Sequence, residues 1–455
     1  MAHGTDGNGG FMRRRHEFVE ESRHEWSSEP AFIASMAAAA VGLGNVWRFP
    51  YIMGENGGGA FVVAYLIALI VVVMPIMILE VAAGRLSKGS TVGTYRQVNR
   101  FGAGYGWFVV LVTTAITSYY LVVTGWTLGY TVDALRGEVR VFASFSAGFN
   151  SLWYFLGTTA LAAAVLLRGV NAIEKLSKLL MPALLLVMLF LVWRASQMPG
   201  WAETRAFFFR VDWGRLLDGK LWGFAFGQAF YTLAIGQGYL VTYGSFIPRK
   251  THLPRACVAV AAVETSVALL AGWMIFPFVF SFGMAADQGS ALAFETLPRV
   301  FARQPGGGLL AVLFFGLFFM AAFSSSLAGL KVIVAAVAEE FRLRNAVAVL
   351  STALLMAVLG SASALSFTPL ALSIRGEPVL DAIDRVAGGD VIIFSGLTGA
   401  ALLCWFIPPQ RIRTVLGTAN RWWEWRIYLI GRLLPLLVLG WGVVTFGVSQ
   451  LRGAG

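Results

Sequence analysis

The feature that most constrains this chain is a series of long apolar segments that recurs over nearly its whole length. A helix that crosses a membrane needs about 20 largely apolar residues, and eleven segments meet that requirement. They cover residues 30–54, 59–84, 106–132, 151–168, 176–194, 219–246, 255–282, 307–338, 345–366, 378–407 and 427–450. The sequence therefore predicts an all-α membrane protein with eleven transmembrane helices.

The composition supports this class and argues against others. Hydrophobic residues make up 57% of the chain and charged residues 13%, whereas about 25% of the residues in a soluble domain are charged. The net charge of +11 comes from short basic clusters between apolar segments, which is typical of membrane topology and does not indicate binding to nucleic acid. The four histidines show no metal-ligand spacing, so the sequence predicts neither an enzyme nor an organic cofactor.

The distribution of Lys and Arg predicts the orientation in the membrane. With a cytoplasmic N-terminus, the inner segments hold about twice as many basic residues as the outer ones, as the positive-inside rule requires. The outer loop 194–220 is basic and goes against the rule. Residues 1–29 lack the apolar core of a signal peptide, so we expect a retained cytoplasmic tail. The C-terminus would be external, in a multi-pass protein of the cell membrane.

Glycine pairs interrupt the first and the sixth segment. Gly42 and Gly44 lie inside the first, and Gly236 and Gly238 inside the sixth. Glycine weakens a helix, and unwound backbone survives at bilayer depth only where it lines a buried cavity; packing of small residues between helices is the alternative. Breaks at corresponding places in two halves indicate a transporter site. We therefore expect two five-helix units, an inverted pair, with helices 1 and 6 unwound at mid-membrane. The units cover residues 30–194 and 219–407, and 427–450 adds an eleventh helix.

Polar residues inside the apolar segments are the candidate functional groups. Ionisable groups at bilayer depth are costly and mark functional sites, and these include Arg48, Glu80, Glu264 and Asp384. Ser324, Ser325 and Ser326 occupy three faces of the eighth segment. They either bond back to their own helix or supply the uncharged oxygens that a small monovalent cation needs.

Several motifs make the chain resemble the neurotransmitter:sodium symporters, whose members share the LeuT fold. The first is Gly42-Leu43-Gly44-Asn45-Val46-Trp47-Arg48-Phe49-Pro50, followed by Glu55-Asn56-Gly57-Gly58-Gly59-Ala60-Phe61. Further matches occur at residues 75–80, 84–85, 119–129, 227–233 and 321–326. The resemblance extends from about Arg23 to the end of the eleventh segment.

The resemblance implies a site for an amino acid and two sodium ions. The substrate carboxylate would bind the amides of Leu43 and Gly44 and the hydroxyl of Tyr120, and the amine would bind carbonyls of Ala40, Tyr231 and Thr232. The first sodium site would consist of Ala40, Asn45, Thr232 and Glu264, together with the substrate carboxylate. The second would consist of Ala38, Val41, Ala321, Ser324 and Ser325.

The resemblance also implies two gates and a structural carboxylate. The outer gate would be Arg48 with Asp384, bridged by Gln228, above a lid of Tyr120 and Tyr231. The inner gate would be Arg23, with Trp26, against Glu339; surface ion pairs of little energetic value are the alternative for these charges. Glu80 would accept amides freed in the sixth helix.

The expected pocket favours a large substrate. It would be lined by Ile116, Tyr120, Tyr231, Ala234, Gln237, Ser325 and Gly329. Because Ala234 and Gly329 are small, we expect a zwitterionic L-amino acid with a bulky apolar or aromatic side chain. A proton-coupled amino-acid permease of the same architecture and an ion channel are the alternatives.

Four departures from the family pattern stand out. Glu264 stands where members have Asn or Asp, and we interpret it as a fixed charge that replaces chloride. Ser324 stands where Thr is frequent, and Tyr231 where Phe is common. Because many members have twelve helices rather than eleven, both a monomer and a homodimer stay open.

Overall fold

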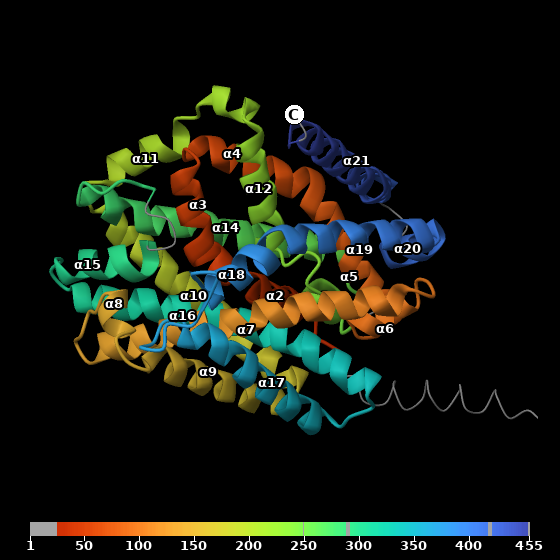
Figure 1. Cartoon of the computed structure of the whole chain (residues 1–455), viewed down its shortest axis with the longest axis horizontal. Helices are drawn as coiled ribbons and strands as arrows, with labels where there is room; N and C mark the ends of the chain where they lie inside the picture. Colours follow the sequence, from red (N-terminus) through yellow and green to blue (C-terminus); the bar gives the residue numbers. More distant parts are fainter. Residues whose placement is uncertain (1–24, 249, 288–291, 417–420, 454–455) are drawn as a thin grey trace, which may run out of the picture.

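The computed structural model describes residues 25–248, 250–287, 292–416 and 421–453, which form a bundle of helices (Figure 1). The first part of the chain forms α2 (Glu29–Ala40), η1 (Gly44–Arg48), α3 (Phe49–Glu55), α4 (Gly59–Ala68), η2 (Leu69–Val73), α5 (Met74–Ser87), α6 (Thr91–Arg96), α7 (Gly102–Leu135), α8 (Phe142–Phe145), α9 (Asn150–Leu167) and α10 (Val170–Ser196). The middle part forms α11 (Trp201–Phe209), η3 (Trp213–Leu217), α12 (Gly219–Thr232), α13 (Tyr239–Gly244), α14 (Leu253–Ser281), η4 (Leu292–Thr296), α15 (Leu297–Ala302) and α16 (Gly307–Glu340). The last part forms α17 (Asn345–Leu365), β1 (Ser373–Ile374), β2 (Glu377–Pro378), α18 (Val379–Ile383), η5 (Asp384–Val391), α19 (Ile392–Phe406), α20 (Pro409–Leu416) and α21 (Arg421–Gly453).

The apolar helices agree with a multi-pass membrane protein. In the described part of the chain, eight helices are long and apolar enough to cross a membrane, or nine if one bent pair counts as a single span. That pair is Glu29–Ala40 with Gly44–Glu55, and its two halves meet at 55°. The predicted sixth segment is divided between α12 and α13, each too short to cross alone. The predicted eleventh falls in α21, where the side chains of 438–453 are outside the described residues. The count of eleven stays a prediction.

The outward faces of these helices are apolar. Leu111 on α7, Leu179 and Leu186 on α10, and Leu354 and Val358 on α17 all have exposed side chains. A soluble protein rarely exposes large apolar patches, whereas lipid chains cover such a surface in a bilayer. The exposed leucines therefore mark faces directed at lipid.

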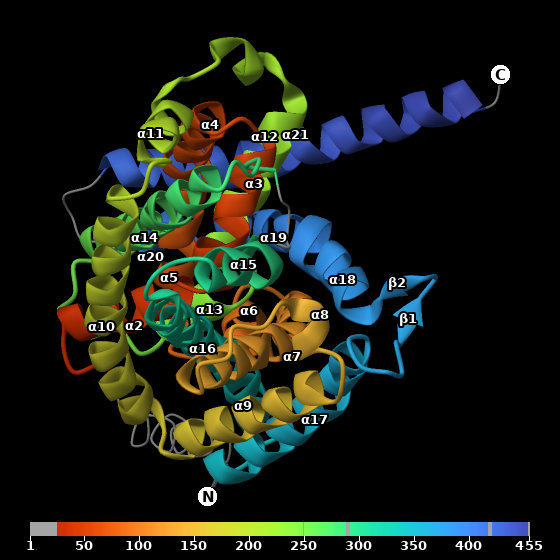
Figure 2. The same cartoon turned by 90° about the vertical axis from the view of Figure 1, so that its left-hand side faces the viewer.

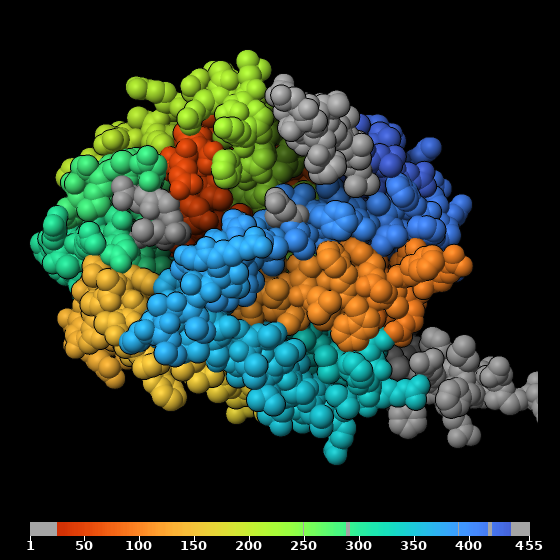
Figure 3. Space-filling model, in the orientation of Figure 1, coloured from red at the N-terminus to blue at the C-terminus, as the bar shows by residue number. Residues whose placement is uncertain are grey.

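The middle of the bundle is formed by two long helices that pack along each other, α7 and α16. Figure 2 shows α9 and α17 side by side below them, and α2 contacts α10, α14 and α16. Distant parts of the sequence meet at the surface, where residues near the start of α7 adjoin α19 (Figure 3). Both interrupted segments lie inside this packing, so their backbone is enclosed by other helices.

Short elements connect the apolar helices. They include α6, α11 and a two-stranded antiparallel hairpin in which Ser373 pairs with Pro378. None of these short elements was predicted from the sequence.

Candidate functional site

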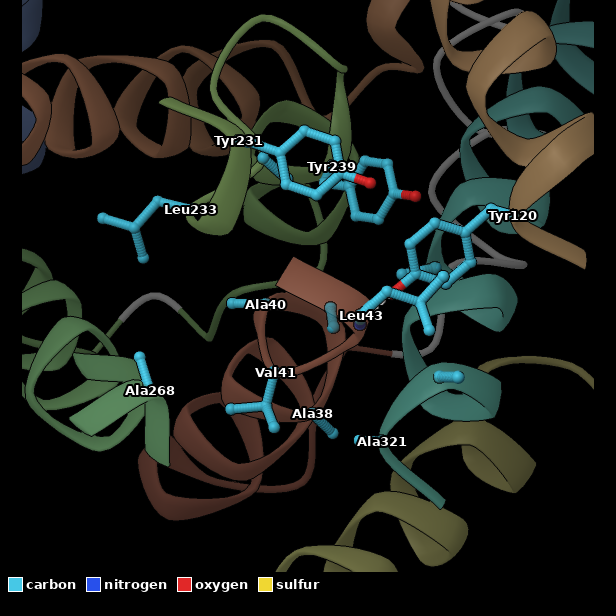
Figure 4. Close-up of a cluster of buried hydrophobic side chains, with 14 of the residues drawn as sticks. Ala38, Ala40, Val41, Leu43, Tyr120, Tyr231, Leu233, Tyr239, Ala268 and Ala321 are labelled. Atoms are coloured by element: carbon cyan, nitrogen blue, oxygen red, sulfur yellow. Dashed lines mark hydrogen bonds between the residues drawn. The ribbon is translucent and has the colours of Figure 1, made fainter. Parts of the chain in front are cut away.

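The first apolar segment leaves its helix at the predicted glycines. α2 ends at Ala40, Val41 has an extended backbone with ψ 110°, and the next helical element, η1, begins at Gly44. Side chains bind the groups released here: the Gly42 N–H donates to Oδ1 of Asn45 at 3.1 Å, and the Leu43 N–H donates to the hydroxyl of Tyr120 at 2.7 Å. Figure 4 shows the Tyr120 ring reaching from α7 toward Leu43.

Gly42 and Gly44 lie in close contact with neighbouring helices. A Cβ on Gly42 would overlap the Tyr120 hydroxyl and lie 2.8 Å from Cβ of Ser325. A Cβ on Gly44 would lie 3.1 Å from the Tyr231 ring and 3.2 Å from Cγ2 of Thr232. A Cβ on Gly42 would therefore require Tyr120 and Ser325 to move, whereas a Cβ on Gly44 would require only small shifts of Tyr231 and Thr232.

The sixth segment is interrupted between Thr232 and Tyr239. Ala234, Gly236 and Gly238 have φ values of +52°, +72° and +74°, a left-handed conformation that ends a helix and that glycine adopts without strain.

Side chains of four other helices bind the backbone of this interruption. Glu80 on α5 accepts from the Gly236 N–H at 3.0 Å, and Ser395 on α19 donates to the Gly236 carbonyl at 2.7 Å. Thr113 on α7 and Thr91 on α6 donate to the carbonyls of residues 237 and 238 at 2.6 Å and 3.3 Å. Unwound backbone at membrane depth is tolerated only with such partners.

A small cavity lies between the two interruptions. Its lining comprises Ala39, Ala40, Gly44, Ile116, Tyr120, Tyr231, Thr232, Ala234, Gln237, Tyr239 and Ser325. The structure thus brings together all the residues expected to bind substrate except Leu43 and Gly329. Leu43 is nonetheless bonded to Tyr120 through its amide, directly beside the cavity.

Tyr239 and Ala39 line the cavity but were missed by the sequence analysis. Tyr239 is the first residue of α13, and in Figure 4 it lies beside Tyr231, from the other end of the interruption. A Cβ on Gly329 would lie 2.6 Å from the Tyr239 hydroxyl and would overlap Oγ1 of Thr117. The room that Gly329 was expected to provide is therefore occupied. Tyr239 directly follows the Gly236–Gly238 motif, and this position was the signal available in the sequence.

Three polar residues of the expected first sodium site lie deep in the bundle. Nδ2 of Asn45 donates to Oε1 of Glu264 at 2.6 Å and to the Glu264 carbonyl at 3.1 Å. Thr232 donates to the Gln228 carbonyl at 3.0 Å. Glu264 is fully buried, and its other carboxylate oxygen accepts from Tyr65 at 3.3 Å and Thr265 at 3.1 Å. Tyr65 and Thr265 were not singled out in the sequence.

The expected second sodium site joins α2 and α16. Ala38, Val41 and Ala321 lie near one another in Figure 4, and α2 packs on α16. Ser324 donates to the carbonyls of Met320 and Ala321, both at 3.0 Å, which is the back-bonding alternative for that serine. Ser325 faces the cavity.

The outer-gate residues form two pairs, Arg48 with Gln228 and Asp384 with Tyr119, and both pairs adjoin Tyr231. Nη1 of Arg48 donates to Oε1 of Gln228 at 3.1 Å, and its guanidinium lies 4.6 Å from the centre of the Tyr231 ring. Asp384 accepts from the Tyr119 hydroxyl at 2.5 Å, and Tyr119 lies 3.4 Å from the Tyr231 hydroxyl. Among the ion pairs of the described residues, none joins Arg48 to Asp384.

Gln228 connects Arg48 of the outer gate to the backbone beside the first interruption. Its Nε2 donates to the Gly44 carbonyl at 2.8 Å, so the gate residue Arg48 and the backbone at Gly44 share one partner. The bridge that was expected to reach Asp384 thus runs instead to Gly44.

The inner-gate residues are described only in part. Arg23 lies outside the described residues. Trp26 is buried and donates to the Tyr243 carbonyl at 3.1 Å, while Glu339 accepts from the Ser90 N–H at 2.7 Å. Glu339 thus caps the loop before α6.

Two interrupted helices around a buried cavity, with their backbone held by other helices, define a secondary transporter of the broken-helix class. The model of the Sodium:neurotransmitter symporter family matches residues 23–151 and 150–452. The chain belongs to this family, as its motifs predicted, and is therefore a sodium-coupled symporter of a small molecule. The family consists of transporters, not enzymes.

Individual proteins show the same relationship. The chain is 31% identical over 443 residues to YhdH, an uncharacterized sodium-dependent transporter of Bacillus subtilis (strain 168), covering 92% of this chain and 97% of that one. It is 28% identical over 446 residues to an uncharacterized sodium-dependent transporter of Haemophilus influenzae, covering 92% and 97%. Among solved structures, MhsT in complex with L-phenylalanine has a TM-score of 0.84 at 30% identity, covering 92% of this chain and 99% of that one.

Proposed function

We propose that the protein transports a zwitterionic L-amino acid with a bulky apolar or aromatic side chain, coupled to sodium, by alternating access. The observation that carries this proposal is the cavity between the two interruptions. It is lined by Ala40 and Gly44, which flank the first interruption, by Ala234 and Gln237 within the second, and by aromatic side chains. Backbone amides suit a carboxylate, and backbone carbonyls suit an ammonium group and sodium. The structure solved with L-phenylalanine in a protein of the same fold supports an amino acid as substrate.

The substrate carboxylate would replace bonds that exist within the protein. The Leu43 N–H donates to the Tyr120 hydroxyl, and a carboxylate that enters between them would accept from both. Because the cavity volume is only about 20 Å³, about enough for one water molecule, its walls must separate before an amino acid can bind. We expect the Tyr231 side chain to move when the cavity opens, because it lines the cavity and its ring lies 4.6 Å from the Arg48 guanidinium.

The proposal includes two sodium sites. In the first, Oδ1 of Asn45, Thr232, the Ala40 carbonyl and the substrate carboxylate would surround the ion, with Glu264 supplying negative charge. In the second, carbonyls of Ala38, Val41 and Ala321 and the hydroxyls of Ser324 and Ser325 would do so. An ion liganded by the substrate makes the binding of each depend on the other, and this linkage is reciprocal.

Alternating access follows from the expected arrangement in the membrane. The units 30–194 and 219–407 would be inverted copies with their breaks at mid-membrane, and rocking of one against the other would expose the cavity to either side. Arg48 with Asp384 would close the outer side, and Arg23 with Trp26 and Glu339 the inner side. We propose a cell-membrane protein with a cytoplasmic N-terminus and an external C-terminus, either a monomer or a homodimer.

The test is uptake into proteoliposomes under an imposed sodium gradient, with a panel of L-amino acids at varied chloride and pH. Sodium-dependent uptake of large apolar or aromatic amino acids is expected. Equal uptake without sodium under a proton gradient would favour the proton-coupled alternative, and conductance without a saturable substrate would favour a channel.

The role of Glu264 has its own test. Its carboxylate is bonded to Asn45, so it places a negative charge beside the expected first sodium, and we propose that this makes transport independent of chloride. Glu264→Gln should lose uptake in chloride-free buffer or become chloride-dependent. Glu138→Gln, a matched change at an exposed glutamate, should keep chloride-free uptake. Unchanged chloride-free uptake in Glu264→Gln removes the proposal.

A further inference from the structure

The carboxamide of Gln237 lines the cavity without a hydrogen-bond partner among the described residues. The backbone of Gln237 is bonded, because its N–H donates to the Ala234 carbonyl at 3.4 Å and its carbonyl accepts from Thr113 at 2.6 Å. The side chain is only 4% exposed and lines the cavity. Among the described residues, no hydrogen-bond partner joins this carboxamide.

Three other polar groups around the cavity have neighbours within the protein at hydrogen-bond distance. The Tyr120 hydroxyl accepts from the Leu43 N–H, Tyr231 lies within hydrogen-bond distance of Tyr119, and Thr232 donates to the Gln228 carbonyl. Most buried polar groups in proteins are hydrogen-bonded. A buried glutamine that lines a cavity with neither its donor nor its acceptor used is therefore available to a ligand.

The surroundings of Gln237 limit what that ligand can be. Ile116, Tyr120, Tyr231 and Tyr239 supply aromatic and aliphatic walls. The space beside Gly329 is filled by Tyr239 and Thr117, so a substrate ring must lie against these walls, next to the carboxamide. A ring that carries a hydrogen-bond donor or acceptor would pack against these walls and also form a hydrogen bond with Gln237.

We infer that the preferred substrate is an L-amino acid whose aromatic side chain carries a hydrogen-bonding group, tyrosine or tryptophan, rather than phenylalanine or leucine. This inference rests on the proposed function and refines its substrate class. Apolar walls discriminate weakly between rings of similar size, whereas a buried polar group left unpaired by the wrong substrate discriminates strongly. Gln237 thus decides between hydroxylated or indole rings and purely apolar ones.

The first experiment uses the wild-type transporter in proteoliposomes. Sodium-dependent binding of a labelled amino acid is displaced by unlabelled L-tyrosine, L-tryptophan, L-phenylalanine or L-leucine. We expect tyrosine or tryptophan to compete at least tenfold better than phenylalanine, which corresponds to about 1.4 kcal/mol. The separate arms show whether the phenol or the indole is preferred.

The second experiment changes the carboxamide. Gln237→Leu should reduce the preference over phenylalanine to about twofold or less, while sodium-dependent binding of phenylalanine is retained or improved. Gln197→Leu makes the same chemical change at an exposed position and should keep the wild-type ratio. Gln237→Met serves the same purpose if the leucine variant cannot be purified as a folded protein.

The possible results distinguish failure of the inference about Gln237 from failure of the proposed function. Phenylalanine or leucine competing as well as tyrosine and tryptophan in the wild type, or an unchanged ratio in Gln237→Leu, overturns the inference and leaves amino-acid transport standing. Failure of every amino acid to bind in a sodium-dependent way overturns the proposed function, and the inference with it.

Discussion

Replacing Gly42 with alanine tests whether the interruption of the first segment must lie in close contact with α7 and α16. The added Cβ would overlap the Tyr120 hydroxyl and come within 2.8 Å of Cβ and 3.0 Å of Oγ of Ser325. Gly42 is not among the residues with positive φ, so the effect is one of space and not of backbone strain. Tyr120 would have to move away from the Leu43 N–H.

The size of the effect follows from these contacts. Overpacking a tight site lowers the stability of the folded protein by about 1–3 kcal/mol, and a displaced Tyr120 hydroxyl would no longer donate to the substrate carboxylate, a hydrogen bond to a charged group worth about 1.5–3 kcal/mol. A loss of about 2 kcal/mol of binding free energy corresponds to roughly 30-fold in affinity. Because Leu43 and Tyr120 would also hold the substrate carboxylate, we expect at least this reduction in substrate affinity.

The assay is sodium-dependent substrate binding by purified protein, together with its thermal denaturation. Gly227→Ala is the matched control: it lies in the interior of α12, and its added Cβ would have Ile393 at 4.0 Å as nearest neighbour. Alanine is favoured over glycine in a helix by about 1 kcal/mol, so this variant should bind normally and be at least as stable. Wild-type affinity in Gly42→Ala would refute the reasoning.

Three further substitutions test other parts of the site. Tyr120→Phe removes the hydroxyl that would donate to the substrate carboxylate beside the Leu43 N–H and should weaken substrate binding about tenfold, an effect of roughly 1.4 kcal/mol, measured by displacement of labelled substrate. Ser395→Ala leaves the buried Gly236 carbonyl without its hydroxyl donor and should lower the melting temperature and the uptake rate together; an unchanged protein would show that this bond is dispensable. Ser324→Ala removes an expected ligand of the second sodium and should raise the half-saturating sodium concentration severalfold in uptake assays, with little change if the serine only bonds to its own helix.

The order of the apolar helices could be predicted from sequence because each depends on a local property. A continuous run of apolar residues predicts α7, α9, α14 and α16 within a few residues of their observed ends. Glycine pairs predict where α2 and α12 stop, since the cost of glycine in a helix is also local. Short elements such as α6 and the β1–β2 hairpin lack such a signal and were not anticipated.

Most site residues that could be predicted belong to a sequence motif or lie close to one. Most residues expected around the substrate do surround one cavity, and Glu80 does contact the amide of Gly236. Tyr239 and Thr117 were missed because their role depends on how α13, α7 and α16 pack beside Gly329. The partner of a side chain on a neighbouring helix is set by that packing.

The sequence by itself determined that the chain is a membrane bundle and that two segments are interrupted by glycine, because composition and helix propensity act within a few residues. It also singled out Glu80 and Glu264, which are buried. Only the tertiary structure decided which partners hold the freed backbone: Tyr120 is 77 positions from Leu43, and Ser395 is 159 positions from Gly236. It also decided that Gln228 connects Arg48 to the Gly44 carbonyl while Asp384 binds Tyr119. Which groups meet as partners depends on how whole helices are placed relative to one another, and the spacing of residues along the sequence does not contain this information.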